Sequence, residues 1–143
     1  MTKPLFSTAI VSQIILVIMF LLILFLAILF FSASNYKLIL NNGRIQINSV
    51  FYSTDISLED VDIKNVKVIN LNESNKKISI RTNGLSLPGM QIGWFRGDGN
   101  KYKLYVTDKT KVVVIPVKNK YEILFSSNDA EKIADGIKKY IIN

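Results

Sequence analysis

The segment 101–125, KYKLYVTDKTKVVVIPVKNKYEILF, has the patterning of three β-strands separated by turns. In residues 101–106, apolar side chains alternate with lysines and one tyrosine, which predicts a strand with one buried face. Residues 112–115 are entirely apolar, as expected for a strand covered on both faces, and Pro116 predicts its end. Residues 121–125 form the third predicted strand. The segment therefore predicts a mainly β domain.

The same signals continue upstream of this segment. Asn41-Asn42-Gly43 predicts a tight turn that joins strands at residues 36–40 and 44–49. Ile78 and Ile80 alternate with polar neighbours, which indicates another half-buried strand. Strands that recur at roughly ten-residue spacing are typical of a β-sandwich or a β-barrel.

Near the C-terminus the apolar pattern changes to the period of an α-helix. One apolar stripe contains Ala130, Ile133, Ala134, Ile137 and Ile141, and the charged residues between them face away. Ser127-Asn128-Asp129 supplies candidate N-caps, and Glu131 stands at capping-box spacing from Asn128. We expect a helix at about residues 129–141 that covers the open end of the barrel.

The N-terminal part of the chain is an apolar run, residues 14–31, without a charge, a glycine or a proline. A helix over residues 9–31 would be about 34 Å long, against a hydrocarbon core of about 30 Å. We therefore predict one transmembrane helix within residues 1–34, followed by a domain over residues 35–143. The alternative is a cleaved signal peptide that leaves an exported cell-envelope domain, because Ser32-Ala33-Ser34 offers small residues at a cleavage-like position.

The charged residues bear on the orientation of the chain in the membrane and on the class of partner it binds. The chain carries 18 Lys and Arg against 11 Asp and Glu, a net charge of +7. Lys3 precedes the apolar run, whereas Lys37 and Arg44 follow it, which favours a cytoplasmic C-terminal domain at the cell membrane. A basic domain suits anionic partners, although a lysine-rich soluble surface has the same composition.

The arrangement of glycine and proline between Arg81 and Phe95, RTNGLSLPGMQIGWF, carries a family resemblance. Residues 105–113, YVTDKTKVV, and residues 115–119, IPVKN, continue it. These motifs, in a chain with one anchor, about seven strands and one C-terminal helix, resemble the bacterial pleckstrin-homology-like (bacterial PH) domains, in particular the small members with N-terminal membrane segments. The resemblance covers roughly residues 36–141. It implies a strongly bent β-barrel or sandwich capped by the C-terminal helix, and it implies no reaction.

The family-motif residues have a structural interpretation of their own. Glycine permits backbone angles that other residues resist, proline stiffens a loop, and consecutive aromatic residues on a strand point to opposite faces. We therefore expect one aromatic residue in the core and one near the rim, and we treat a ligand loop as the alternative. The residues concerned are Gly84, Pro88, Gly89, Gly93, Trp94 and Phe95.

Catalytic chemistry has little support in the sequence. The chain contains no histidine and no cysteine, which removes Ser–His and Cys–His nucleophile pairs and most zinc or iron sites. Ser74-Asn-Lys-Lys77 has the S-x-x-K spacing of Ser–Lys acylases, but it lies in a polar turn rather than at a helix start. We predict no catalytic residue, metal or cofactor, and a Ser/Lys hydrolase is the remaining enzymatic alternative.

Lysines in and between the last predicted strands form the best candidate site. A lysine near an anionic membrane surface favours binding by about 1 kcal/mol, and no aromatic platform that would suit nucleic acid is evident among them. We predict a membrane-tethered, non-enzymatic binding or scaffolding module. Its expected partners are the bilayer and either a protein or anionic lipid head groups. The candidate residues are Lys101, Lys103, Lys109, Lys111, Lys118 and Lys120.

Overall fold

The computed structural model describes residues 7–140, and the chain divides into two compact units, Met1–Asn35 and Tyr36–Asn143. The first unit contains helix α1 (Thr8–Ser34), whose N-cap Ser7 accepts a hydrogen bond from the Ile10 N–H. Within the described part of the chain, α1 is the helix that is long and apolar enough to cross a membrane. The structure confirms a helix at residues 9–31 and adds a short extension at each end, while its insertion in a membrane stays a prediction.

The second unit begins with a small antiparallel sheet in the order β1-β2-β3. The turn between β1 and β2 places Asn42 at φ 48° and Gly43 at φ 72°. Two consecutive residues with positive φ match the twist of a two-residue hairpin, which is why Asn-Gly is favoured there. The predicted hairpin is confirmed. The strands are β1 (Lys37–Asn41), β2 (Arg44–Asn48) and β3 (Thr54–Ser57).

The larger sheet has the order β4-β8-β9-β7-β6-β5. Its neighbouring strands are antiparallel, except that β7 and β9 run parallel, with Tyr102 opposite Glu122. As a result β9 lies between β8 and β7, although it follows both in the sequence. The strands are β4 (Lys67–Ile69), β5 (Ile80–Leu87), β6 (Met90–Gly97), β7 (Asn100–Val106), β8 (Val112–Val117) and β9 (Tyr121–Ser126), and two short 3-10 helices, η1 (Leu58–Asp60) and η2 (Ile63–Asn65), precede β4.

The structure corrects three details of the predicted strands. Residues 7–140 contain nine strands, rather than about seven, because β3 and β4 were not predicted. Pro116 does not end β8, which continues to Val117, and the Pro116 carbonyl accepts the Asp62 N–H at 2.9 Å. In β7, Lys103 and Tyr105 are buried as well, so this strand is covered on both faces.

The hairpin of β5 and β6 brings two backbones into unusually close contact. Gly84 pairs with Gly93 across the two strands. A Cβ atom on Gly93 would lie 2.5 Å from the Asn83 carbonyl oxygen, and one on Gly84 would lie 2.4 Å from the Ile92 carbonyl oxygen. Neither position has room for a side chain, so both glycines are required by the pairing of the strands.

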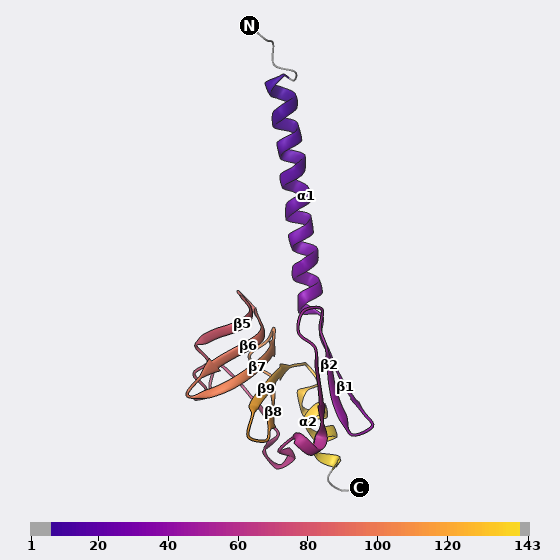
Figure 1. Cartoon of the computed structure of the whole chain (residues 1–143), viewed down its shortest axis with the longest axis vertical. Coiled ribbons are helices and arrows are strands. Elements are labelled where there is room, and N and C mark those ends of the chain that lie inside the picture. The colour runs from indigo at the N-terminus through magenta and orange to yellow at the C-terminus, as the bar shows by residue number, and fades with distance from the viewer. Residues whose placement is uncertain (1–6, 141–143) are drawn as a thin grey trace. The chain divides into compact units, whose positions relative to one another are not determined.

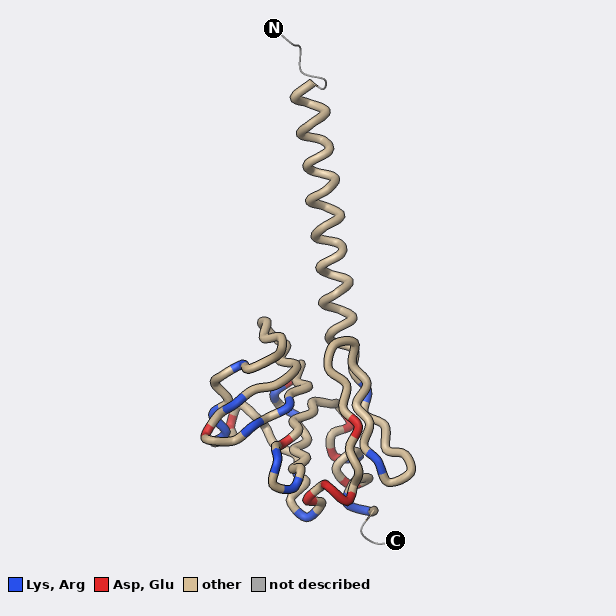
Figure 2. The backbone as a smooth tube through the Cα atoms, viewed as in Figure 1, with Lys and Arg blue, Asp and Glu red and all other residues tan. Residues whose placement is uncertain are grey.

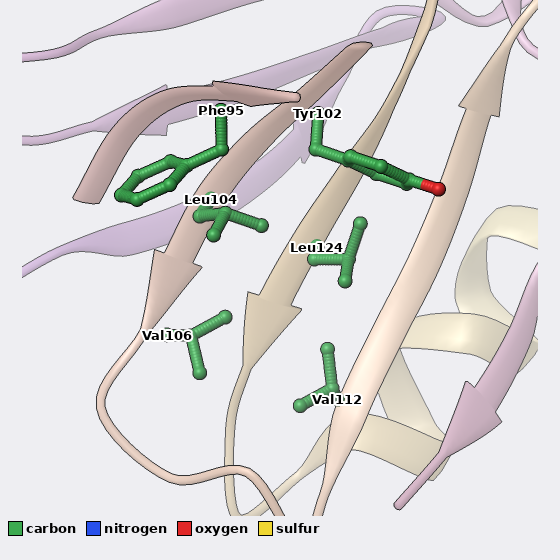
Figure 3. Packing of buried hydrophobic residues seen from close by; sticks show 6 residues of the cluster. All are labelled: Phe95, Tyr102, Leu104, Val106, Val112 and Leu124. Atoms are coloured by element: carbon green, nitrogen blue, oxygen red, sulfur yellow. The ribbon is translucent and has the colours of Figure 1, made fainter. Parts of the chain in front are cut away.

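One face of the larger sheet carries a compact apolar cluster, which Figure 3 shows on strands β6 to β9. The segment between β4 and β5 covers this cluster through Leu71 and Ile78, with Ile69 at the end of β4. The adjacent residues Phe95 and Trp94 diverge as expected, because Phe95 is buried and Trp94 is partly exposed. The cluster consists of Phe95, Tyr102, Leu104, Val106, Val112 and Leu124.

Helix α2 (Ala130–Lys139) packs against both sheets (Figure 1). It contacts β4 and β8, and its Gly136 approaches Leu40 of β1. The N-cap is Asp129, which makes no side-chain cap and instead pairs with Lys132 at 2.7 Å, so the expected capping box with Asn128 does not form. In the predicted stripe, Ala130, Ala134 and Ile137 are buried, Ile133 is partly buried, and Ile141 lies outside the described residues.

Candidate functional site

A hollow of about 610 Å³ opens on the larger sheet, at the start of β7 and β9. Residues from β5, β6, β7, the β8–β9 turn and the start of β9 line it, and we call it the basic hollow. Among the described residues that line it, three are cationic and none is acidic. Its lining residues are Thr82, Asn83, Trp94, Phe95, Arg96, Lys101, Asn119, Lys120 and Tyr121.

Strand register explains why these side chains meet. Arg96 of β6 lies opposite Lys101 of β7. The parallel pairing of Tyr102 with Glu122 places Tyr121 beside Lys101. Because side chains alternate between the faces of a strand, these cations share one face of the sheet with Trp94. The site therefore depends on the parallel contact between β7 and β9.

An aromatic pair forms one wall of the basic hollow. The rings of Trp94 and Tyr121 meet edge to face, with centroids 4.8 Å apart and planes at 73°. The ammonium of Lys103 lies 5.1 Å from the Trp94 ring centroid and donates to the Ser53 carbonyl oxygen at 2.8 Å. Lys103 therefore supports Trp94 from within the fold and is not available to an external anion.

Two pKa shifts accompany this arrangement. Burial lowers the pKa of the Lys103 ammonium, because desolvation disfavours the charged form. Burial raises the pKa of the Tyr121 hydroxyl, and the charge of Asp60 adds to that shift. Near neutral pH the Tyr121 hydroxyl therefore stays protonated and can donate a hydrogen bond to an anionic ligand.

The six predicted lysines do not form a single patch. Lys101 and Lys120 line the basic hollow. Lys118 is the first residue after β8, in the same turn as Lys120, but its ammonium donates to the Glu59 carbonyl oxygen at 2.6 Å. Lys109 and Lys111 lie in the β7–β8 loop, beyond the opposite end of β7, roughly 20 Å away at about 3.3 Å per residue. Figure 2 shows basic residues distributed over several loops and strands of the second unit.

Sequence reasoning missed Arg96, Asn119 and Tyr121 as members of this site. Arg96 follows Trp94 by two residues in β6, and that spacing on a strand was a sufficient signal for a shared face. The sequence pattern places Tyr121 in a strand and no more, because nothing local indicates which strand pairs with β9. The aromatic pair that accompanies the lysines is therefore a finding of the structure.

In the S-x-x-K candidate, the serine hydroxyl and the backbone of Lys77 make local contacts. The Ser74 hydroxyl donates to the Leu71 carbonyl oxygen at 3.1 Å, within its own turn. The Lys77 N–H donates to the Asp98 carboxylate at 2.8 Å, while Lys76 pairs with Glu122. Across residues 7–140, no group of three or more His, Cys, Asp or Glu side chains is placed to hold a metal ion. The geometry offers a surface for binding an anion beside aromatic rings.

Comparison with known proteins gives one match. A family model described as a bacterial PH domain matches residues 36–141. The comparison with curated proteins found no significant match, and neither did the comparison with solved structures. The matched range follows α1 directly and covers the two sheets and α2, which confirms the resemblance read from the sequence motifs. The chain therefore belongs to the bacterial PH domain family.

Proposed function

We propose that this protein is a single-pass membrane protein whose PH domain is a non-enzymatic binding module. PH-like domain families are generally non-catalytic. The observation that carries the proposal is the basic hollow, where Arg96, Lys101 and Lys120 surround the Trp94–Tyr121 pair. Cations and aromatic rings together suit a ligand with carboxylate groups and flat or apolar side chains. The proposed ligand is an acidic segment of a protein partner.

The hollow lies at the opposite end of β7 from the residue that begins the domain. Tyr36, the first residue of the domain, follows Ser34 of α1 after a single residue. Its hydroxyl accepts the Thr107 N–H at 3.1 Å, so it lies at the end of β7 opposite Lys101. The length of β7, roughly 20 Å, exceeds the Debye length of about 8 Å. Charges close to Tyr36 are therefore largely screened at the hollow, and we propose a protein rather than a lipid head group as its ligand.

Attachment of this module to the membrane rests on α1. Apolar side chains over the length of a bilayer favour insertion. The proposed location is the cell membrane, with the domain on the cytoplasmic side, as Lys37 and Arg44 favour. Cleavage of α1 as a signal peptide would instead release the domain into the cell envelope.

The sole tryptophan, Trp94, reports directly on the basic hollow. The full chain, held in phosphatidylcholine nanodiscs, is titrated with a glutamate-rich peptide that contains tyrosine but no tryptophan. We expect a saturable change in Trp94 emission that weakens with added salt. Arg96→Glu and Lys101→Glu should each lower the affinity by about tenfold or more, because each replaces attraction with repulsion.

Lys109→Glu is the matched control, since it reverses one exposed charge in the β7–β8 loop, away from the hollow. Equal losses in Lys109→Glu and Lys101→Glu, or no saturable change in the unaltered chain, would refute the assigned site. A Trp94 response to phosphatidylglycerol nanodiscs without peptide, lost in Lys101→Glu, would identify a lipid head group as the ligand instead.

A further inference from the structure

We infer that the end of the domain joined to α1 forms a second membrane contact, with Val50, Phe51 and Leu87 entering the lipid interface. The inference rests on the proposal that α1 spans the bilayer, and it is independent of the basic hollow. The surface consists of apolar loop tips with lysines around them. Its proposed occupant is the anionic face of the same leaflet in which α1 ends.

Four parts of the second unit define this surface, which we call the tether end. They are Tyr36, the β2–β3 loop at residues 49–53, the β5–β6 turn around Pro88 and the β7–β8 loop at residues 107–111. All four lie at or next to strand ends that the register and the hydrogen bonds bring together.

Register and contacts link the four parts. Lys37 pairs with Asn48, so the β2–β3 loop starts beside the first residue of β1. The Tyr36 hydroxyl accepts the Thr107 N–H at 3.1 Å, which holds the β7–β8 loop against the same residue. Leu87 lines one hollow together with Thr107, which places the β5–β6 turn beside that loop. The tether end is therefore a continuous region of one compact unit.

Tyr36 is fixed firmly within the domain. Its hydroxyl lies 2.6 Å from the Ser126 hydroxyl, in addition to the contact with Thr107. Its ring packs edge to face on Phe125, with centroids 5.2 Å apart, and lies 5.9 Å from the Tyr105 ring. Because four residues of the domain hold Tyr36, it cannot act as a flexible linker.

Chain length then limits how far the tether end can lie from the lipid. The apolar run ends at Phe31, and Ser32 to Ser34 add the last turn of α1, about 5 Å. Only Asn35 separates that turn from Tyr36, and consecutive Cα atoms are about 3.8 Å apart. With α1 in the bilayer, Tyr36 lies within about 13 Å of the hydrocarbon, at the depth of the head groups.

The tether end exposes apolar side chains that the domain covers only in part. Val50 is 63% exposed, Phe51 47% and Leu87 44%, and they project from two different connections between strands. Exposed apolar residues beside basic ones are typical of segments that lie in the membrane interface. Because Tyr36 is held near the head groups, the three apolar side chains beside it can reach the lipid surface.

The charges around these tips suit an anionic leaflet. Lys37, Lys109 and Lys111 are exposed at this end of the domain. Asp108 stands among them, and its carboxylate accepts hydrogen bonds from the N–H and the hydroxyl of Thr110 at 2.8 and 2.7 Å. The balance is positive, and basic residues within a Debye length of a leaflet that contains anionic lipid are attracted to it.

The chain has no cysteine, so a single introduced cysteine can carry a nitrobenzoxadiazole label. The full chain is reconstituted in vesicles of phosphatidylcholine and phosphatidylglycerol, with Val50→Cys, Phe51→Cys or Leu87→Cys. We expect blue-shifted emission at all three positions and quenching by lipids that carry nitroxide groups near the head group. Labels at the two loops should respond together, since one surface contains both.

Lys139→Cys is the matched control. Lys139 is exposed, and the neighbouring Tyr140 hydroxyl accepts the Gly43 N–H at 2.9 Å, at the far end of the β1–β2 hairpin. Its label should show neither the shift nor the quenching. Equal quenching at residues 139 and 51, or none at residue 51, would overturn the inference. A blue shift at residue 51 without lipid quenching, which disappears on dilution of the protein in the vesicles, would indicate a second copy and would also overturn it.

One further label separates the inference from its premise, and one charge reversal tests the part played by the lysines. Leu21→Cys, in the middle of α1, must be quenched by nitroxides deep in the acyl chains; otherwise α1 does not span and the inference fails with it, whereas the peptide titration of the basic hollow is unaffected. Reversing two charges, with Lys109→Glu and Lys111→Glu in the Phe51→Cys chain, should reduce quenching in the anionic vesicles. Retention of full quenching there would show that charge has no part in this contact.

Discussion

At the scale of single residues, the β5–β6 hairpin shows how a sequence can require glycine. Gly93 adopts φ +111°, and the space that a Cβ atom would occupy is filled by the backbone of Asn83 and Gly84. Gly89 also has positive φ, +77°, but nothing lies within 4 Å of its missing side chain. A substitution at Gly89 therefore introduces backbone strain alone, whereas one at Gly93 introduces backbone strain and a steric collision.

Gly93→Ala should destabilise the domain by roughly 3 kcal/mol or more, because the backbones of β5 and β6 must separate. Gly89→Ala, which introduces strain alone, should cost about 1–2 kcal/mol. Guanidinium denaturation of the full chain in non-ionic micelles, followed by Trp94 emission, measures both free energies of unfolding. Equal costs in the two variants would contradict the close contact between Gly84 and Gly93.

Tyr105 provides a prediction about pH. Its hydroxyl donates to the Tyr52 carbonyl oxygen and lies 2.7 Å from the Thr54 hydroxyl. Burial raises the pKa of Tyr105 from 10.0 to about 12, while the hydrogen bond with Thr54 acts in the opposite direction. The unfolded chain therefore ionises at this residue first, so the contribution of Tyr105 to stability is complete below pH 10 and is lost as the pH rises towards 12.

Across that window the free energy of unfolding should fall by roughly 2–3 kcal/mol through this residue. Tyr105→Phe should cost about 1–3 kcal/mol at neutral pH, since it leaves polar groups without a partner. It should also flatten the fall in stability above about pH 10. The measurement is denaturation of both chains at several alkaline pH values, and parallel curves would exclude a raised pKa at Tyr105.

At the scale of elements, α2 is held by packing rather than by its cap. Asp129 provides no side-chain cap, and Gly136 lowers the intrinsic helix propensity by about 1 kcal/mol relative to alanine. Ala134 and Ile137 are buried, with Ile137 fully inaccessible. The helix therefore depends on the contacts of its apolar face with β4 and β8.

Ile137→Ala should lower the free energy of unfolding by about 2–5 kcal/mol, because it leaves a cavity between the helix and the sheets. Lys138→Ala, at the adjacent exposed position, should change it by no more than about 0.5 kcal/mol. Thermal unfolding by circular dichroism compares the two. A similar small effect in both variants would mean that α2 is not packed as the structure shows.

At the scale of the whole molecule, the central question is what α1 does. If it is an uncleaved anchor, the full chain should stay in the pellet when vesicles are washed with alkaline carbonate, and mass spectrometry should find the N-terminal residues. The apolar side chains of α1 account for this retention. A mature chain that starts at Asn35 would instead establish the signal-peptide alternative.

The side of the membrane needs its own measurement. Fusion of alkaline phosphatase to the C-terminus should give an inactive enzyme, because that reporter folds only after export. This outcome follows from the placement of Lys37 and Arg44 after the apolar run. Active phosphatase in a chain that remains carbonate-resistant would place the domain outside the cytoplasm, and would move both the hollow and the tether end to that side.

Local patterns predicted much of the fold because they depend on neighbouring residues. The Asn-Gly turn, the apolar residues 112–115 and the helical stripe from Ala130 to Ile137 each carry their own signal. Strand β4, with the three residues Lys67–Ile69, is too short to show a period. Lys103 looked exposed because it alternates with apolar residues, whereas the distant β2–β3 loop covers it.

The sequence alone determined that this chain has a long apolar helix, a β domain with a C-terminal helix, and neither histidine nor cysteine for common catalysis. Each of these properties is contained in composition or in contacts between near neighbours. Only the tertiary structure decided that Lys101 and Lys120 meet Trp94 and Tyr121, while Lys109 lies at the tether end. The physical reason is the parallel pairing of β7 with β9, whose stability comes from contacts between residues distant in the sequence.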